Sequence, residues 1–237
     1  MPLPTVKALT FDVFGTVVDW RTSIIEEGSA LNRKHGVDID WSAFADAWRG
    51  LYQPSLSKVR NGQLPWTNLD DLHRTSLAAL LPRYGLTGLN DEQVDNLNRV
   101  WHRLKPWPDA VDGLCRLKSR FTLATLSNGN VACLVNMAKH AGLPWDAILG
   151  AEVARHYKPE PDAYLTTARL LGLGPEQCLM VAAHNEDLVA AGRLGFRTAF
   201  VARRTEYGPA QNTDLKPEHR FDIVADDFGA LATALGC

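Results

Sequence analysis

The sequence predicts an α/β fold in which helices cover both faces of a parallel sheet and an all-helical segment follows the first strand. The candidate strands are short apolar runs with little polar alternation, which is typical of strands buried on both faces. Amphipathic helical patterns separate these runs, and that order is typical of a parallel sheet. From Asp19 to about Pro106 the pattern is helical throughout.

The elements of the sheet part follow one another in a regular order. The predicted strands are 5–14, 121–127, 147–154, 178–183, 198–202 and 222–225. The predicted helices lie at about 109–119, 130–141, 161–172, 185–194 and 227–235. Apolar β-type runs indicate the strands, and helical spacing of apolar residues indicates the helices. The segment 202–220 is rich in charge, Pro and Gly, which predicts a solvated loop.

Three amphipathic segments carry the helical pattern of the insertion: WSAFADAWRGLY, LDDLHRTSLAALL and DEQVDNLNRVWHRL. Residues that break helices separate them, namely Gly62, Pro65, Pro82 and Gly85. We therefore expect a core of residues 1–18 and 108–237 and a helical cap of residues 19–107. The alternative is one interleaved α/β domain without a separate cap.

The composition is ordinary for a globular protein, with 46% apolar and 22% charged residues. Lys and Arg number 25 against 27 Asp and Glu, so no strong overall field favours nucleic acid or a membrane surface. No apolar run is long enough to span a bilayer, and the start shows no signal-peptide pattern. The four cysteines have no CxxC spacing and indicate reduced thiols. We therefore expect a cytoplasmic protein.

Polar residues follow four of the predicted strands, at the edge where open α/β sheets bind their ligands. In chain order they are Asp12, then Ser127, Asn128 and Gly129, then Lys158, and finally His184 to Asp187. Each alone has an ordinary explanation, such as a helix cap or a solvated loop charge. Four such groups at four strand ends predict one shared site.

Four segments resemble the four motifs of the haloacid dehalogenase-like hydrolases: FDVFGTVVD, LSNGN, YKPEPDAY and the loop VAAHNEDL. The resemblance extends over the core in the right order, and the helical insertion lies where that superfamily often has its cap. It implies a Rossmann-like core and a nucleophilic Asp12 that forms a covalent aspartyl intermediate. Thr16, Ser127 and Lys158 are the residues that the resemblance assigns to stabilising this intermediate.

Two positions depart from the magnesium-dependent phosphatases of that superfamily. Phe14 stands where they carry a second Asp as general acid, and Ala183 stands where they carry a metal-binding Asp. A carboxylate that attacks a phosphate dianion meets a repulsion on the order of 4 kcal/mol for each charge pair at about 4 Å and an effective dielectric of about 20. Magnesium offsets this repulsion and needs oxygen ligands. A halide leaving group needs no proton, so we expect neither a metal nor another cofactor.

Further residues are similar to those of the L-2-haloacid dehalogenase branch. The segment DAWRGLY resembles the motif of its halide-binding arginine, which assigns that role to Arg49. Lys158 and Tyr164 match a Lys and a Tyr that hold and orient the site. Asp187 matches the carboxylate that positions the hydrolytic water or the lysine. Without the motif, Arg49 on an amphipathic helix would be interpreted as a surface residue, and Tyr164 as a packing residue.

Of the remaining site residues, two match the L-2-haloacid dehalogenase branch and one differs from it. Ser127 and Asn128 match the pair that contacts the substrate carboxylate and supports the site loop. His184 stands where the branch has an asparagine that helps to receive the halide. Two interpretations of His184 stay open. It caps the following helix or pairs with Glu186, or its imidazole narrows the leaving-group pocket and suits a small halide such as fluoride.

The sequence therefore predicts metal-independent hydrolysis of short 2-haloalkanoic acids, including haloacetates, to 2-hydroxy acids. The route is a two-step displacement through an ester of Asp12. The expected partner is the small haloacid, with a homodimer possible in this family and neither nucleic acid nor membrane expected. Two alternatives stay open: a magnesium-dependent phosphatase on the same scaffold, and a non-catalytic protein that binds small anions.

Overall fold

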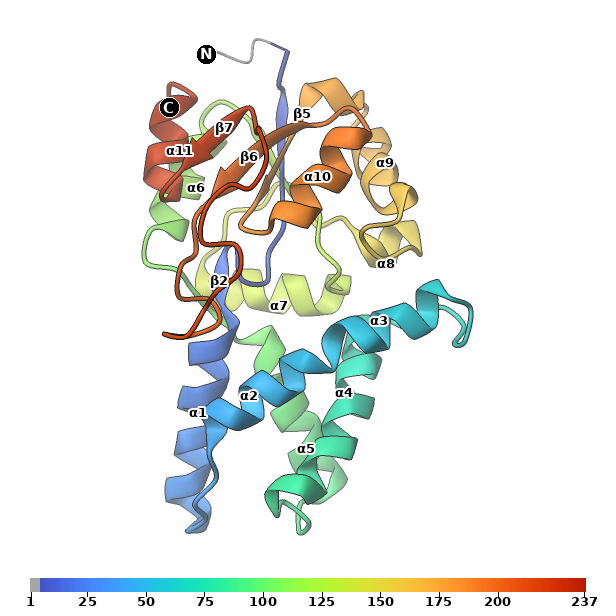
Figure 1. Cartoon of the computed structure of the whole chain (residues 1–237), viewed down its shortest axis with the longest axis vertical. Helices are drawn as coiled ribbons and strands as arrows, with labels where there is room; N and C mark the ends of the chain where they lie inside the picture. The colour runs from blue at the N-terminus through green and yellow to red at the C-terminus, as the bar shows by residue number, and fades with distance from the viewer. Residues whose placement is uncertain (1–4) are drawn as a thin grey trace.

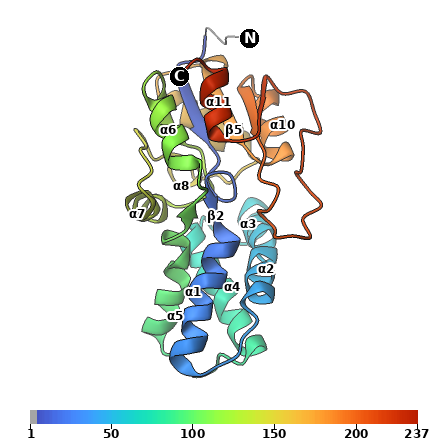
Figure 2. The same ribbon diagram turned by 90° about the vertical axis from the view of Figure 1, so that its left-hand side faces the viewer.

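The computed structural model describes residues 5–237, which form two parts stacked along the long axis of the molecule (Figure 1). The upper part is a sheet with helices on both faces, and the lower part consists of helices (Figure 2). Within the described residues, no helix combines the length and the apolar character needed to cross a membrane.

The upper part is built on five parallel strands in the order β4-β1-β5-β6-β7. Their bounds are β1 (Ala8–Phe11), β4 (Thr122–Thr125), β5 (Cys178–Ala182), β6 (Arg197–Val201) and β7 (Ile223–Ala225). β1 pairs with β4 on one side and with β5 on the other. The winding of the sheet therefore reverses beside β1, which is the position where such sheets form their sites.

Successive residues of β1 enter two separate hydrophobic clusters. Leu9 and Phe11 belong to one cluster, and Ala8 belongs to the other. In the upper part, the first cluster includes α6 (Ala110–Lys118), α7 (Val131–Ala141) and α11 (Phe228–Ala234), and it continues into the lower part; the second includes α9 (Pro161–Leu170) and α10 (Asn185–Arg193). Because successive side chains of a strand point to opposite faces, the sheet is covered on both faces, as the sequence predicts.

The predicted strand at 147–154 is wrong. The segment forms only isolated bridges, such as the one between Ser127 and Gly150, and its second half is a short helix, α8 (Ala151–Ala154). Gly150 has a φ of +131°, and a Cβ there would lie 2.2 Å from the Ser127 carbonyl oxygen. The backbone turns at this glycine, so the apolar run does not continue as a ladder.

The lower part begins and ends at a two-stranded antiparallel ribbon, β2 (Val18–Asp19) paired with β3 (Lys105–Pro106). We call the helices between these strands the cap: α1 (Trp20–His35), α2 (Trp41–Gly50), α3 (Tyr52–Arg60), α4 (Leu69–Leu80) and α5 (Asp91–Asn98), with the 3₁₀ turns η1 (Leu81–Tyr84) and η2 (Arg99–His102). Side-chain oxygens cap α1, α2, α4 and α5 by accepting from backbone N–H groups; the residues are Asp19, Asp40, Asn68 and Asn90. These short polar residues define where the helices begin.

The segment 202–220 is solvated only in part, which corrects the prediction. Arg203 and Glu206 are buried, whereas most residues from 209 onward are exposed. The Arg203 guanidinium donates to both carboxylate oxygens of Asp109, at 2.7 and 2.9 Å, and to the Thr16 carbonyl at 2.9 Å. Arg203 and Glu206 can be buried because polar groups from distant parts of the chain pair with their charges.

Candidate active site

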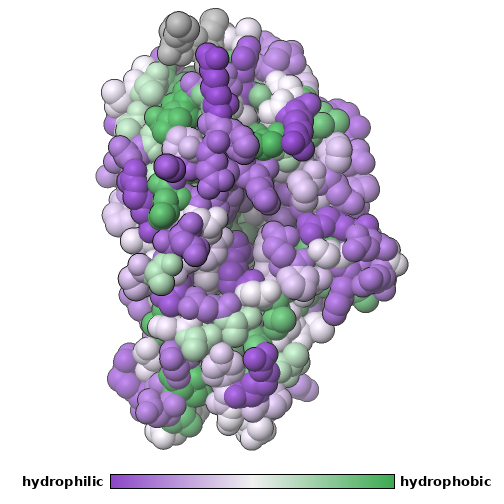
Figure 3. All heavy atoms as spheres, viewed as in Figure 1, coloured by the Kyte–Doolittle hydropathy of each residue, from purple (hydrophilic) through white to green (hydrophobic). Residues whose placement is uncertain are grey.

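A cavity of about 800 Å³ lies where the carboxyl ends of the strands face the cap. The surface is hollowed between the two parts, and mostly hydrophilic residues surround the hollow (Figure 3). Most of the predicted site residues line this cavity: Asp12, Arg49, Asn128, Lys158, Tyr164, His184 and Asp187. Thr16 and Ser127 are fully buried and lie behind the cavity wall.

Asp12 follows β1 directly, and its two carboxylate oxygens have different partners. Oδ1 accepts from Lys158 Nζ at 2.9 Å. Oδ2 accepts from Thr16 Oγ1 at 2.7 Å and lies 3.1 Å from His184 Nδ1. Burial by itself raises the pKa of Asp12, but Lys158, His184 and Thr16 outweigh it and hold that pKa far below its usual range. The side chain is therefore a buried, ionised carboxylate.

Lys158 lies between two carboxylates. Its Nζ donates to Asp12 Oδ1 and, at 2.5 Å, to Asp187 Oδ2. The other oxygen of Asp187 accepts from the Tyr164 hydroxyl at 2.5 Å. Burial lowers the pKa of Lys158, yet the two carboxylates raise it above the usual value, so the ammonium stays charged. Asp187, from the first turn of α10, thus holds the lysine in place.

The loop after β4 connects the lysine to the cap. Asn128 Oδ1 accepts from the Lys158 backbone N–H at 2.8 Å, and Asn128 Nδ2 donates to the Tyr52 hydroxyl at 3.0 Å. Ser127 Oγ accepts from the Gly129 N–H at 3.1 Å. The amide of Asn128 is therefore engaged by the protein on both sides, and it orders the loop that carries Lys158.

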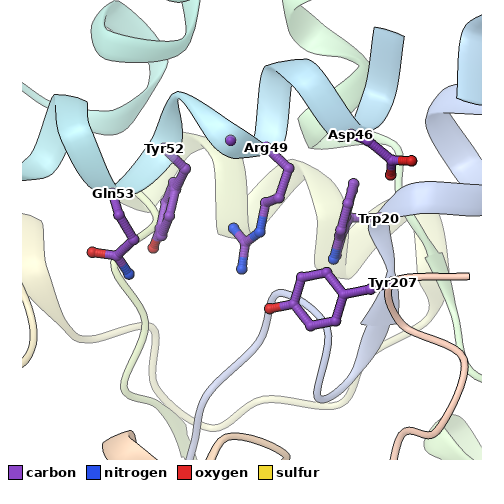
Figure 4. Close-up of a pocket in the computed structure, with 7 residues that line it drawn as sticks. Trp20, Asp46, Arg49, Tyr52, Gln53 and Tyr207 are labelled. Carbon is purple, nitrogen blue, oxygen red and sulfur yellow. The ribbon is translucent and has the colours of Figure 1, made fainter. Parts of the chain in front are cut away.

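The side chain of Arg49 is only 13% exposed and lies between aromatic rings, so its interpretation as a surface residue is wrong. Its guanidinium carbon lies 4.3 Å from the centre of the Tyr52 ring and 5.4 Å from that of Trp20. Figure 4 shows Arg49, Trp20, Tyr52 and Tyr207 around a smaller cavity of about 390 Å³. Arg49 Nη1 is buried and has no hydrogen-bond partner among the described residues. A desolvated cationic donor of this kind is suited to an anion.

His184 pairs with Glu206 and not with Glu186. Its Nε2 lies 2.9 Å from Glu206 Oε2, while its Nδ1 faces Asp12. His184 precedes α10 without capping it through its side chain. Burial lowers the pKa of His184, but Glu206 and Asp12 outweigh burial and raise that pKa well above the usual value. The ring is therefore held as an imidazolium between two carboxylates.

Four residues at the site were not predicted from the sequence: Glu206, Trp20, Tyr52 and Tyr207. Tyr52 had a usable signal, because it lies three residues after Arg49 in the segment DAWRGLY and such neighbours share a helix face. Glu206 had none. It stands in a segment without periodicity, and its partner Trp20 lies 186 positions away in the chain.

A magnesium ion does not fit the donor set beside Asp12. Asp12 and Asp187 supply carboxylates, but the Lys158 ammonium lies between them and occupies an oxygen of each. Phe14 and Ala183 have no side-chain oxygen to offer. Magnesium requires several oxygen ligands in near-octahedral geometry, and the free oxygens here are too few for that. The positive charge beside Asp12 is supplied by the lysine instead.

A second group of potential metal ligands lies at the contact between cap and core. The ligand atoms of Asp70, His102 and Cys133 lie within 4.8 Å of one another. Asp70 and His102 already form a pair at 3.0 Å. Burial and the nearby Asp70 raise the pKa of the Cys133 thiol well above its usual value, which disfavours the thiolate that a metal needs. The group is best described as a hydrogen-bonded Asp–His pair beside a buried thiol.

Comparison with known proteins places these features in a family. A family model described as haloacid dehalogenase-like hydrolase matches residues 6–195. The crystal structure of the L-2-haloacid dehalogenase PA0810 is similar with a TM-score of 0.95 and 48% identity, covering 98% of this chain and 99% of that one. The defluorinating L-2-haloacid dehalogenase Rha0230 is similar with a TM-score of 0.96 and 44% identity, covering 100% and 99%.

Curated relatives include enzymes of two kinds. (S)-2-haloacid dehalogenase 4A from Burkholderia cepacia is 28% identical over 231 residues, which is 96% of each chain. Hexitol phosphatase A from Escherichia coli is 40% identical over 178 residues, 74% of this chain and 73% of its own. The chain therefore belongs to the haloacid dehalogenase-like hydrolases, and within that family it resembles the L-2-haloacid dehalogenases.

Proposed function

We propose that this protein hydrolyses short 2-haloalkanoic acids to 2-hydroxy acids through an ester of Asp12, without a metal. The observation that carries the proposal is the placement of Lys158 Nζ, 2.9 Å from Asp12 Oδ1 and 2.5 Å from Asp187 Oδ2. The lysine keeps the nucleophile ionised and supplies the positive charge that a cation supplies in a phosphatase. The similarity to L-2-haloacid dehalogenases supports the same chemistry.

In the first step, Asp12 attacks the α-carbon from the side opposite the halogen and inverts that centre. Arg49 receives the halide with the buried Nη1 that lacks a partner among the described residues. We place the substrate carboxylate at the backbone amides beside Ser127 and Asn128, because the side chain of Asn128 is already engaged. Water then attacks the carbonyl carbon of the ester and releases the hydroxy acid.

One turnover with excess enzyme in oxygen-18 water tests the covalent route. We expect the label in the carboxylate of Asp12 and unlabelled oxygen in the first molecule of 2-hydroxy acid, because the ester is cleaved at its acyl carbon. Label found directly in the first product molecule would refute the ester and show that water attacks the substrate itself.

His184 bears on which halide the enzyme releases most readily. An imidazolium at position 184 is bulkier than an amide and carries a positive charge, which attracts a small anion more strongly than a large one. It therefore favours a small, strongly hydrogen-bonding leaving group, and we propose fluoroacetate and chloroacetate as better substrates than bulky bromoacids. The similarity to a dehalogenase described as defluorinating supports this preference.

A magnesium-dependent phosphatase is the second candidate, and the similarity to hexitol phosphatase A favours it. Phe14 and Ala183 oppose it, since they remove the general acid and one metal ligand. Parallel assays separate the two candidates. We expect haloacetate turnover that is unchanged by a chelator and no hydrolysis of phosphate monoesters with magnesium. Chelator inactivation that magnesium reverses would exclude the proposed mechanism.

A further inference from the structure

Glu206 and His184 form a buried pair beside the nucleophile. Glu206 Oε2 lies 2.9 Å from His184 Nε2, and His184 Nδ1 lies 3.1 Å from Asp12 Oδ2. The Glu206 side chain is only 1% exposed, whereas His184 lines the cavity and is 18% exposed. A carboxylate that orients an imidazole toward the reacting group is the arrangement of an acid–base pair.

The position of Glu206 is fixed by contacts on several sides. Trp20 Nε1 donates to Glu206 Oε1 at 3.0 Å, and the guanidinium of Arg49 lies 4.0 Å from the same oxygen. Arg203 begins the turn that carries Glu206, and its own guanidinium is bound to both oxygens of Asp109. The carboxylate is therefore held by the core and the cap together, and it presents one oxygen to the imidazole.

The other groups around Asp12 are poor candidates for a base. Both oxygens of Asp187 already accept hydrogen bonds, from Lys158 and Tyr164. Lys158 is charged and donates to Asp12. Within residues 5–237, His184 is the side chain in contact with Asp12 whose ring nitrogen can give up its proton and take one back once the charge of Asp12 is lost in the ester.

We propose that, within the dehalogenation on which this inference rests, His184 is the general base for hydrolysis of the Asp12 ester and Glu206 is its positioning residue. In the first step the bond from Asp12 to the α-carbon forms and the carbon–halogen bond breaks. The halide leaves with the bonding electron pair, and the imidazolium proton leaves the site with it. The esterified Asp12 no longer carries the charge that held this proton.

In the second step the neutral Nδ1 takes a proton from water while the water oxygen attacks the carbonyl carbon of the ester. The acyl carbon–oxygen bond then breaks, and the departing alkoxide takes the proton of the new Asp12 carboxyl group. Asp12 is again a carboxylate and His184 again an imidazolium. The balance is one haloacid and one water consumed, with one hydroxy acid, one halide and one hydrogen ion released.

A rapid-quench experiment with chloroacetate tests the proposal on full-length His184→Asn and Glu206→Gln variants. Chloride and glycolate are measured separately, and the intact mass of the protein reports the ester. We expect a burst of one chloride per active site, followed by glycolate release slowed about 100-fold in His184→Asn and about 10-fold in Glu206→Gln. The mass of the ester should accumulate on both variants. Unfolded protein cannot form the ester, so its accumulation distinguishes a slowed second step from a loss of folding.

His156→Asn is the matched control, because the His156 side chain is 45% exposed and its carboxylate partners, Glu160 and Asp162, do not line the cavity. It should release chloride and glycolate at the rates of the unmodified enzyme, without an accumulated ester. If the two test variants slow chloride and glycolate equally and no ester accumulates, His184 is not the base. If the unmodified enzyme itself releases no halide, the proposed function fails, which is a separate outcome.

Discussion

Asp12 is surrounded by more positive charge than a structural carboxylate needs. Lys158 and His184 approach different oxygens of the same buried side chain, at 2.9 and 3.1 Å. An ordinary buried ion pair is satisfied by one cation, and a second one adds a desolvation cost. The arrangement is understandable if the carboxylate reacts, because its charge then disappears and returns during each turnover.

Asp12→Asn should abolish halide release, with a loss of about 10⁴-fold or more in the first-step rate, because an amide is a very poor nucleophile toward carbon. Halide release from chloroacetate measures this effect. Asp226→Asn is the control, since the ion pair of Asp226 with Arg204 lies at an exposed site. It should retain full activity. An active Asp12→Asn variant would contradict the assignment of the nucleophile.

His184→Asn should change the halide preference. The smaller, neutral amide widens the leaving-group pocket and removes a positive charge, so fluoride release should fall more than bromide release, by about 10-fold in the ratio of first-step rates. Rates of halide appearance from fluoroacetate and bromoacetate in a single turnover give this ratio directly. An unchanged ratio would show that the imidazole does not select the halide.

At the scale of elements, the loop between β1 and β2 depends on Gly15. This residue has a φ of +85°, and a Cβ there would lie 2.0 Å from Glu206 Oε1. The loop therefore leaves room for a carboxylate that arrives from the segment after β6. A glycine in the first motif thus serves two purposes, the left-handed turn and the close approach of Glu206.

Gly15→Ala should destabilise the fold by at least about 3 kcal/mol, since it combines backbone strain with displacement of a buried carboxylate. Gly36→Ala is the matched control. Gly36 also has a positive φ, of +64°, but nothing lies within 4 Å of a Cβ there. That control should cost about 1–2 kcal/mol. Urea unfolding measures both, and equal losses would show that the contact with Glu206 carries no energy.

Local patterns in the sequence predict most of the strands and helices of the upper part, with one exception. The strands at β1, β4, β5, β6 and β7 and the helices between them are confirmed, because apolar runs and helical spacing are local signals. The segment 147–154 carries the same local signal and is not a strand, because Gly150 turns the backbone beside Ser127. A local pattern indicates which segments are buried, but not which of them pair along their length.

The site likewise contains residues that the sequence predicts and one, Glu206, that it does not. Asp12, Lys158 and Asp187 were predicted because each follows an element of the core at one edge, and the structure brings them within hydrogen-bond distance. Glu206 was assigned to a solvated loop, since charge, Pro and Gly predict exposure when only neighbours in the chain are considered. Its burial depends on Trp20 and His184, and contacts at such separation leave no periodic trace.

At the scale of the whole molecule, the cap contacts the loops that carry the site residues. Arg60 Nη1 donates to the Lys158 carbonyl at 2.8 Å, and the Tyr52 hydroxyl accepts from Asn128. Trp20, at the start of the cap, donates to Glu206. The cap therefore orders the loops that carry the site residues as well as covering them.

Stability should depend on pH through His184, which is faced by Asp12, Glu206 and Tyr207, with Lys158 and Arg49 behind the carboxylates. Its pKa is raised in the folded state, so its ion pairs stabilise the fold fully below the unfolded value of about 6.5. This contribution is lost only as the pH rises through the higher folded value.

The free energy of unfolding of the unmodified protein should therefore exceed that of His184→Asn by on the order of 3 kcal/mol near pH 6, because the variant leaves Glu206 buried without its partner. The difference should shrink as the pH rises from the unfolded value toward the higher folded one, where the folded imidazole also loses its proton. Urea unfolding at several pH values measures both variants. His156→Asn is the control, since its side chain is 45% exposed and its pairs lie at the surface, so its difference should stay small. A gap for His184→Asn that widens with rising pH would show that the ring is neutral in the folded protein, which would contradict its ion pairs with Asp12 and Glu206.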